Sequence, residues 1–392
     1  SISGMQIVSK AHEKGLHLTP AQLFQHQTIA EQAAIATEKS SIDVSATPAL
    51  GKVPLRPIQQ NFFEQTLSNP HHYNQAVMLT VTSDSQADVI QSALTAIARH
   101  HDSLRLRFEK GVFEKEAERW QQEYADSDTV SVELADIDLT GQNARSLNAV
   151  ITEVQTSLNL TKGPLFKGAL LTLASGKHLL LVAHHLLIDG VSWRILLTDL
   201  LTAHQQITDR QPVTLPAKTT AFGNWTRHLN EQIRENTFEP ERSYWLEACR
   251  ETSPLPVEHP SGLNTVADTQ EIVVALSTQE TTALKGLNWP VNVLLLGAIA
   301  QTLKQWSQCN SFVVDMEGHG RHTWDESFDL SRTVGWFTAL YPLRLSLPSG
   351  GFDELLTEVK NQLAQVPNGG VGYGALKFSA PEKSPQALVS PA

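Results

Sequence analysis

Two adjacent histidines followed by an aspartate are the residues of this sequence best suited to chemistry. His184 and His185 precede three apolar residues and then Asp189 and Gly190. An imidazole gains and loses a proton near neutral pH, so it suits general acid–base catalysis. The positive end of a helix dipole nearby would favour a developing negative charge. This spacing therefore predicts a site for proton transfer.

A strand and a helix must position these residues, because the hydrophobic pattern changes around them. Two apolar runs, Leu165 to Leu173 and Leu179 to Ala183, flank a short glycine-containing turn, which is typical of a β-hairpin. The histidines are thus expected at the end of a buried strand, and Asp189 at the start of a helix. After Gly190 the apolar residues follow a helical period, with one face made by Val191, Ile195, Thr198 and Leu201.

The sequence contains two other histidine pairs, His71-His72 and His100-His101. The first pair lies in a polar Asn-Pro loop, and the second pair ends a predicted helix. Neither is followed by Asp-Gly at a strand-to-helix turn. A histidine pair without such a context is more often structural than catalytic, so we expect both of these pairs to be structural.

A second group of ionisable residues follows the apolar run Phe312 to Val314. Asp315, Glu317, His319 and Arg321 occupy alternating positions, which a strand would place on one face. Ionisable groups at the end of an apolar strand are costly unless they are paired or solvated in a cleft. A structural salt bridge is one explanation, for Arg321 above all, and a polar cleft is the other.

Three further segments are distinctive without indicating a reaction by themselves. Pro57 to Gln65 (PIQQNFFEQ) is expected to begin a helix that packs aromatic rings into the core. Leu330 to Leu347 contains a strand-like alternation from Trp336, whose ring suits a channel wall or a packed core equally well. Pro367 to Phe378 is rich in glycine, but no Gly-Lys-Ser/Thr follows, so a phosphate-binding loop is not predicted.

The chain divides into four predicted parts. Residues 1–38 are expected to be helical and are too few to fold alone. Residues 39–52 are small, polar and punctuated by Pro and Gly, which is typical of a linker. Residues 53–220 and 221–392 are expected to form two lobes that mix α and β structure. The start at a serine and the Ser/Pro-rich end indicate a piece of a longer protein.

Composition argues against several classes of protein. The net charge of −11 is unfavourable for nucleic-acid binding, and 392 residues suggest more than one domain. The longest apolar run, near Val293 to Ala300, is less than half a membrane span. The two cysteines, Cys249 and Cys309, suggest neither a disulfide framework nor a zinc knuckle. We therefore expect a cytoplasmic protein that does not span a membrane.

The pattern H-H-x-x-x-D-G, with V-S-W behind it, resembles the active-site motif of the condensation and epimerization domains of nonribosomal peptide synthetases. The segments P-I-Q, E-G-H-G-R, R-T-V-G-W-F-T and P-N-G-G-V-G-Y-G resemble further epimerization-domain motifs, in the family's order. Asn61 stands where the first motif usually has Trp, and the seventh motif would lie beyond Ala392. Residues 1–38 resemble the second half of a peptidyl carrier domain.

This resemblance implies a fold of two chloramphenicol-acetyltransferase-like lobes that form a V with a central tunnel. It implies that His185 works at the active site and that Glu317 faces the tunnel as an acid/base residue. Asp189 is expected to be a structural ion-pair partner that fixes the turn. Supporting roles around the active site are implied for His184, Asp189, Gly190, Trp193, Arg321 and Trp336.

The carrier-like segment implies a cofactor and partners. Ser1, followed by Ile, matches the serine that carries the 4′-phosphopantetheine arm, and Thr28 and Glu31 form a capping-box pattern. No metal is implied, because H-E-x-x-H is absent and no ligand set converges, and no pyridoxal phosphate site is apparent. The expected partners are the upstream carrier and adenylation domains, a downstream condensation domain or module, and an aminoacyl or peptidyl thioester.

The implied reaction is epimerization at Cα of an L-aminoacyl or peptidyl thioester, which gives a mixture of D and L forms for antibiotic biosynthesis. Glu317 is expected to carry one proton, and His185 to carry the other or to stabilise the enolate. A condensation domain, which shares H-H-x-x-x-D-G, is an alternative. A non-catalytic module that docks carrier domains is a second alternative, and a free-standing acyltransferase is a more distant one.

Overall fold

A computed structural model describes residues 4, 7, 8, 10, 11, 14–18, 22, 23, 26, 28–38, 49–65, 67–112, 118–141, 146–250, 255–259, 262, 265–321, 328–379 and 388. The chain forms two compact units that alternate along the sequence. One unit contains Ser1–Asn236 and His319–Ala339, and the other contains Thr237–Gly318 and Leu340–Ala392. Helices and strands occur in both units, which confirms the predicted mixed α and β class. The carrier, linker and lobe boundaries stay predictions.

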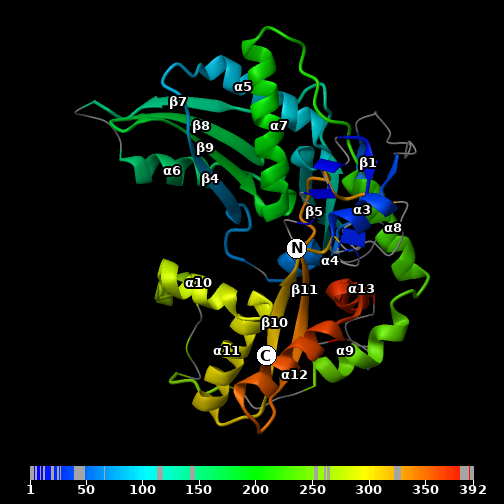
Figure 1. Ribbon diagram of the computed structural model, residues 1–392. Helices are drawn as coiled ribbons and strands as arrows, with labels where there is room; N and C mark the ends of the chain where they lie inside the picture. Colours follow the sequence, from blue (N-terminus) through cyan, green and yellow to red (C-terminus); the bar gives the residue numbers. More distant parts are fainter. Residues whose placement is uncertain are drawn as a thin grey trace. The chain divides into compact units, whose positions relative to one another are not determined.

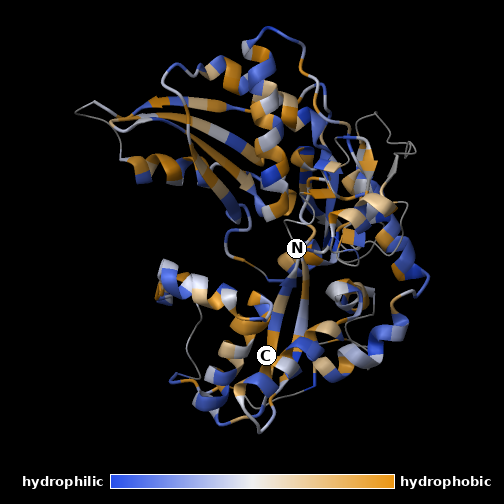
Figure 2. Cartoon of the chain, viewed as in Figure 1, coloured by the Kyte–Doolittle hydropathy of each residue, from blue (hydrophilic) through white to orange (hydrophobic). Residues whose placement is uncertain are grey.

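A four-stranded sheet with the order β4-β9-β8-β7 is the centre of the first unit. The predicted hairpin is confirmed as β8 (Phe166–Leu173) and β9 (Gly176–His184), which pair antiparallel. β4 (Asn74–Thr80) pairs antiparallel with the other edge of β9, and β7 (Leu134–Asp138) runs parallel to β8. Figure 2 shows hydrophobic residues concentrated along β8 and β9, as expected for strands inside a core.

Helices cover this sheet, and one of them follows the end of β9. α5 (Ala87–His100) and α6 (Leu147–Thr156) lie on opposite sides of the sheet in Figure 1. α7 (Gly190–Thr208) follows β9 after a single 3-10 turn, His185–Leu187, and packs against α5. The predicted strand-to-helix turn is therefore confirmed.

The predicted face of α7 needs a correction. Val191 and Ile195 are buried, but Thr198 is exposed and Leu201 is 70% exposed. The buried side of the helix contains Asp199 instead, because this carboxylate is paired with cations inside the unit. The hydrophobic period of a sequence does not show which acidic residues are buried. The sequence pattern therefore assigned Thr198 and Leu201 to the buried face of α7 and left Asp199 out of it.

A smaller sheet and several helices complete the first unit. β3 (Gly51–Val53), β6 (Glu118–Tyr124) and β5 (Leu106–Val112) form an antiparallel sheet, with α4 (Pro57–Glu64) and α8 (Phe222–Arg234) in the same unit. α4 begins at the predicted proline and buries Phe62. The predicted pattern of aromatic residues packing into the core is confirmed there.

The described part of residues 1–38 is not wholly helical. The capping box of Thr28 and Glu31 is confirmed at the start of α3 (Ile29–Ile35). However, β1 (Leu16–His17) and β2 (Thr37–Glu38) pair as a short antiparallel ladder. Strands of two residues carry no period that a sequence pattern could detect, which explains why they were missed.

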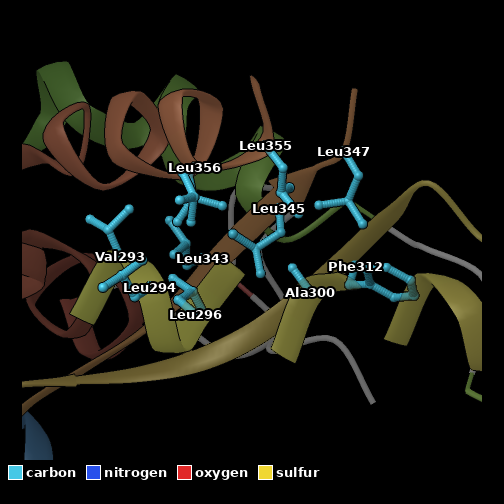
Figure 3. Close-up of a cluster of buried hydrophobic side chains, with 11 residues drawn as sticks. Val293, Leu294, Leu296, Ala300, Phe312, Leu343, Leu345, Leu347, Leu355 and Leu356 are labelled. Carbon is cyan, nitrogen blue, oxygen red and sulfur yellow. The ribbon is translucent and has the colours of Figure 1, made fainter. Parts of the chain in front are cut away.

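The second unit has a hydrophobic core of its own. Its elements are α9 (Arg242–Ala248), α10 (Thr278–Gly286), α11 (Val291–Ser307), β10 (Ser311–Gly318), β11 (Ala339–Ser346), α12 (Phe352–Ala364) and α13 (Val371–Ser379). β10 and β11 form a two-stranded sheet. Figure 3 shows side chains of α11, β10, β11 and α12 meeting in one cluster, which includes Leu294, Phe312, Leu343 and Leu356.

The glycine-rich segment before α13 is a packed turn in the second unit. Asn368, Gly369 and Gly370 have positive φ, and a Cβ on Gly370 would overlap the ring of Tyr341. The Asn368 amide donates to Glu241. Glycine is needed here for close packing, which agrees with the sequence argument against a phosphate-binding loop.

Within the described residues, no single helix combines the length and the hydrophobicity needed to cross a membrane. The bent pair of α10 and α11 passes that test only when the two helices are taken together.

Candidate active site

His185 lies directly after the last residue of β9, between two aromatic rings. Its backbone N–H donates to the Tyr73 carbonyl oxygen at 2.8 Å, which continues the pairing of β9 with β4. The Tyr73 ring stacks on the imidazole with centroids 5.5 Å apart, and the Trp336 ring lies 4.4 Å away. The imidazole is partly exposed, whereas the side chain of His184 is fully buried. An aromatic frame thus fixes the ring plane of His185.

The two ring nitrogens of His185 have different partners. Nδ1 lies 2.9 Å from the Ile188 carbonyl oxygen, and Nε2 lies 2.9 Å from the side-chain nitrogen of Gln75. A carbonyl oxygen can only accept a hydrogen bond, so Nδ1 carries the proton. Nε2 then presents its lone pair to the Gln75 amide. Nε2 is accordingly the basic nitrogen of the ring.

His184 points to different partners and has no access to solvent. Its Nε2 lies 2.9 Å from the Pro70 carbonyl oxygen, and its Nδ1 accepts a hydrogen bond from the Leu186 N–H. Burial lowers the pKa of His184 to about 4. The neutral ring is held on both sides, so His184 supports the turn and does not exchange protons at neutral pH.

Asp189 caps α7 and forms a buried ion pair. Its Oδ1 accepts from the Ser192 N–H at 2.8 Å, and both carboxylate oxygens lie 3.0 Å from Nη2 of Arg321. Asp189 and Arg321 are 6% and 5% exposed. This is the structural ion pair that we expected of Asp189. Gly190 is the exposed first residue of α7 and has no close neighbour that requires glycine.

The segment around residues 328–337 is fastened to α7 by polar contacts. Arg321 donates through Nη1 to the carbonyl oxygens of Leu330 and Thr333, at 3.0 and 2.6 Å. The Phe337 N–H donates to Asp189, and the Gly335 N–H donates to the Ser192 hydroxyl. Trp336 lies between these anchors, which explains how its ring is held against His185.

Arg56 is a buried cation that sequence reasoning did not single out. It is 3% exposed, and its guanidinium lies 4.7 Å from the centre of the Phe337 ring, which Arg321 also contacts at 4.1 Å. Burial, and then the charge of Arg321, lowers the pKa of Arg56 to about 9. Phe337 thus packs between two cations beside the Asp189 ion pair.

Glu317 belongs to the second unit. On β10, the side chains of Phe312, Val314 and Met316 pack in the core cluster, so the alternate side carries Asp315 and Glu317. Both carboxylates are exposed. The predicted alternation holds as far as Glu317, but β10 ends at Gly318. Arg321 therefore does not share a strand face with Glu317, and it pairs in the first unit instead.

Two other expectations concern groups outside this cluster. Ser1, the predicted phosphopantetheine attachment residue, lies outside the described residues.

The ligand atoms of His100, His101 and Asp199 lie close enough together to hold a metal ion. However, Asp199 already bonds His101 at 2.9 Å and Arg332 at 2.5 Å, which makes this group a buried ion-pair network. That geometry agrees with the structural role expected for His100-His101.

Gln75 and Tyr73 are the residues at this site that sequence reasoning missed. Tyr73 directly precedes β4, and Gln75 is the second residue of β4. Both lie on the side that faces His185 across the strand pair, because Gln75 opposes Ala183 in the register. Trp193, which was predicted, bonds Gln75 and not the imidazole itself. The available signal for Gln75 was a polar amide just before the apolar residues AVML of a strand-like segment.

Comparisons with known proteins agree on one family. The family model of the condensation domain matches residues 49–391. A linear gramicidin synthase protein of Brevibacillus parabrevis is 39% identical over 395 residues, which are 97% of this chain and 8% of that protein. Surfactin synthase subunit 2 of Bacillus subtilis is 33% identical over 388 residues, 96% of this chain and 11% of that protein. The chain thus spans a small part of these relatives.

Solved structures show the same fold. The epimerization domain from the third module of tyrocidine synthetase B has a TM-score of 0.78 and 30% identity, over 87% of this chain and 79% of that chain. The first condensation domain of the calcium-dependent antibiotic synthetase, solved with a substrate analogue, has a TM-score of 0.64 and 19% identity over the same shares. The second likeness concerns the fold alone.

Proposed function

This chain belongs to the condensation-domain family, and we propose that within the family it is an epimerization domain. It inverts Cα of an aminoacyl or peptidyl thioester that a carrier domain presents on its phosphopantetheine arm. The likeness to the tyrocidine synthetase epimerization domain, at 30% identity and a TM-score of 0.78, is the observation that carries this proposal. The E-G-H-G-R and R-T-V-G-W-F-T segments of the sequence support it.

The reaction needs a base on one face of Cα and an acid on the other. The C–H bond at Cα breaks, and its electron pair moves to the thioester carbonyl oxygen to give an enolate. A proton then returns to the opposite face, so the composition of the substrate is unchanged. Each well-placed proton carrier contributes about 10²–10⁴-fold to the rate.

We assign Glu317 as one proton carrier and His185 as the other. Glu317 is an exposed carboxylate at the end of β10, so its charged form is solvated and able to accept a proton. Nε2 of His185 carries a lone pair rather than a proton. This favours His185 as the base that takes the Cα proton over His185 as a hydrogen-bond donor that stabilises the enolate. The Asp189 carboxylate caps α7 beside Gly190, so the helix N-terminus is less suited to hold an anion.

The remaining partners follow from this role. An upstream carrier domain and its adenylation domain would supply the L-aminoacyl or peptidyl thioester, and a downstream condensation domain or module would use the D form. The chain itself would work without a metal or pyridoxal phosphate, in the cytoplasm.

Exchange at Cα in heavy water tests the proposed function. The chain is supplied in trans with a carrier domain loaded with an L-aminoacyl-phosphopantetheine thioester; the acid is then released and analysed by mass and by chiral chromatography. Deuterium at Cα together with a D/L mixture supports epimerization. Peptide formation with an added acceptor carrier, without deuterium, would establish condensation instead. Neither signal would leave a non-catalytic carrier-docking module as the better explanation.

Glu317→Gln separates the proposed proton carrier from the fold. Gln keeps the size of the side chain but cannot accept the Cα proton, so deuterium incorporation should fall by about 10²-fold or more. Asp315→Asn is the matched control, because it makes the same change two residues earlier on the same side of β10. Equal exchange by the Glu317→Gln variant and the unmodified chain would remove Glu317 from the mechanism.

A further inference from the structure

We infer that Gln75 is a positioning residue that keeps His185 neutral, with the lone pair on Nε2. This inference rests on the proposed function, since it says how the proposed base is held ready. Gln75 comes from β4 and His185 from the end of β9, so the contact joins two neighbouring strands of the central sheet. Gln75 affects the reaction through His185.

A chain of three hydrogen bonds defines the arrangement. The Trp193 indole N–H donates to Oε1 of Gln75 at 2.9 Å. The Gln75 amide nitrogen lies 2.9 Å from His185 Nε2, and His185 Nδ1 lies 2.9 Å from the Ile188 carbonyl oxygen. Each end of this chain is a group with only one possible role, since an indole N–H only donates and a carbonyl oxygen only accepts.

These fixed ends decide the direction of every bond between them. Because Trp193 can only donate, the oxygen of the Gln75 amide must face the indole, and its NH₂ group must face His185. The NH₂ group can only donate, so Nε2 of His185 accepts. A rotated Gln75 amide would place its NH₂ group against the Trp193 N–H and lose both bonds.

The same geometry disfavours the imidazolium. A proton on Nε2 would point at the Gln75 NH₂ group, and two donors would then face each other. Nε2 of His185 therefore presents a lone pair in the resting site. Access to Nε2 requires the substrate to displace the Gln75 NH₂ group, which makes this contact part of substrate entry.

The charged and titratable neighbours of His185 do not supply an alternative partner for Nε2. Tyr73 stacks on the ring face, and His184 is neutral and turned to Pro70. Asp189 lies beyond Ile188 and is paired with Arg321. His71 and His72 interact electrostatically with His184. Among the residues that the structure describes, Gln75 is the hydrogen-bond partner at Nε2.

The experiment measures the protonation of His185 directly. The 392-residue chain is labelled with ¹⁵N-histidine, and the ring-nitrogen signals of His185 are assigned by their loss in His185→Asn. At pH 7 we expect a protonated Nδ1 and an unprotonated Nε2. A ring protonated at Nε2, alone or with Nδ1, would overturn the inference.

Gln75→Glu reverses the hydrogen bond. Its carboxylate accepts at Nε2 while Ile188 still accepts at Nδ1, so both ring nitrogens should become protonated at pH 7. If the proposed function is right, exchange at Cα should fall by about 10²-fold at pH 7 and recover at higher pH. Trp193→Phe should act in the same direction and more weakly, because it frees the Gln75 amide to rotate.

The controls separate this inference from the proposed function. Gln91→Glu makes the same chemical change on the exposed side of α5 and should leave both the ¹⁵N spectrum and exchange unchanged. An unaltered His185 signal in Gln75→Glu, in a chain that remains folded, would refute the role of Gln75. Absence of exchange in the unmodified chain would refute epimerization, while the ¹⁵N spectra would still decide the tautomer.

Discussion

His184 ends β9 and His185 directly follows it, and their rings lie in different surroundings. Successive side chains of an extended strand point to opposite sides, so His184 turns into the unit and His185 turns toward Tyr73 and Trp336. Burial holds the pKa of His184 at about 4. The identical residue one position later keeps a solvent-accessible ring with a basic nitrogen. Residue type alone therefore does not distinguish a structural histidine from a candidate base.

Asp189→Asn tests how strongly the buried ion pair supports this site. The substitution leaves the Arg321 charge buried without its carboxylate, and breaking such a pair typically costs about 3–5 kcal/mol of unfolding free energy. Urea unfolding at pH 7 measures the loss. Glu133→Gln is the control in the same unit: it breaks a pair whose acidic side chain is 69% exposed, so the change should be about 1 kcal/mol or less. Equal losses in the two variants would contradict the structural role of Asp189.

At the scale of elements, the return segment His319–Ala339 brings the distant motif to the site. Arg321 pairs with Asp189, Arg332 pairs with Asp199, and Gly335 packs against the ring of Phe222. These contacts leave Trp336 against His185. Arg321, Arg332 and Gly335 thus anchor the segment to the rest of the unit, and Trp336 places its aromatic ring against His185.

Gly320→Ala should destabilise the first unit at the start of this segment. Gly320 has a φ of +61°, and a Cβ there would overlap the Phe337 carbonyl oxygen. Backbone atoms cannot move aside as a flexible side chain can, so we expect a loss of about 2 kcal/mol or more. Calorimetric melting checks this. Gly286→Ala, where no atom lies within 4 Å of the added Cβ, should be neutral or slightly stabilising.

At the scale of the whole molecule, the chain leaves the first unit after Asn236 and returns to it at His319. The returning segment is joined to the first unit through buried charges, in two networks around Asp189 and Asp199. The same unit contains two neutral histidines, the partly buried His100 and the fully buried His184. Burial, and then the neighbouring His101, lowers the pKa of His100 to about 4. The stability of this unit should therefore depend on pH.

The sign of that dependence follows from the two lowered histidine pKa values. Below pH 6.5 the unfolded chain binds protons at His100 and His184, while the folded unit stays neutral there until about pH 4. Stability is present above pH 6.5 and is lost as the pH falls toward 4. Between pH 7 and 5 each histidine should remove about 2 kcal/mol.

Urea unfolding at pH 7, 6 and 5 measures this loss. His100→Gln should make the dependence shallower by the share of one histidine. A stability that does not change between pH 7 and 5, or a variant with an unchanged slope, would show that these rings are not buried in the neutral form.

The sequence by itself determined the local elements and the family. The change of hydrophobic period after Gly190 predicted β9 and α7. The H-H-x-x-x-D-G pattern with the later motifs indicated a condensation-family domain, which the family match confirms. These inferences succeeded because hydrophobic period and capping residues act over a few neighbouring positions. The prediction of the buried face of α7 was wrong because it used only neighbouring positions. The charged partners of Asp199 lie more than 95 residues away in the chain.

Only the tertiary structure decided which groups surround the candidate base. Gln75 and His185 are 110 residues apart, and Trp336 comes from the segment that returns from the second unit. Arg321 looked like a continuation of the β10 face, yet it pairs with Asp189 because the chain leaves the strand at Gly318. The direction of a hydrogen bond and the burial of a side chain depend on partners that folding brings together. The spacing of residues in the sequence does not identify these partners.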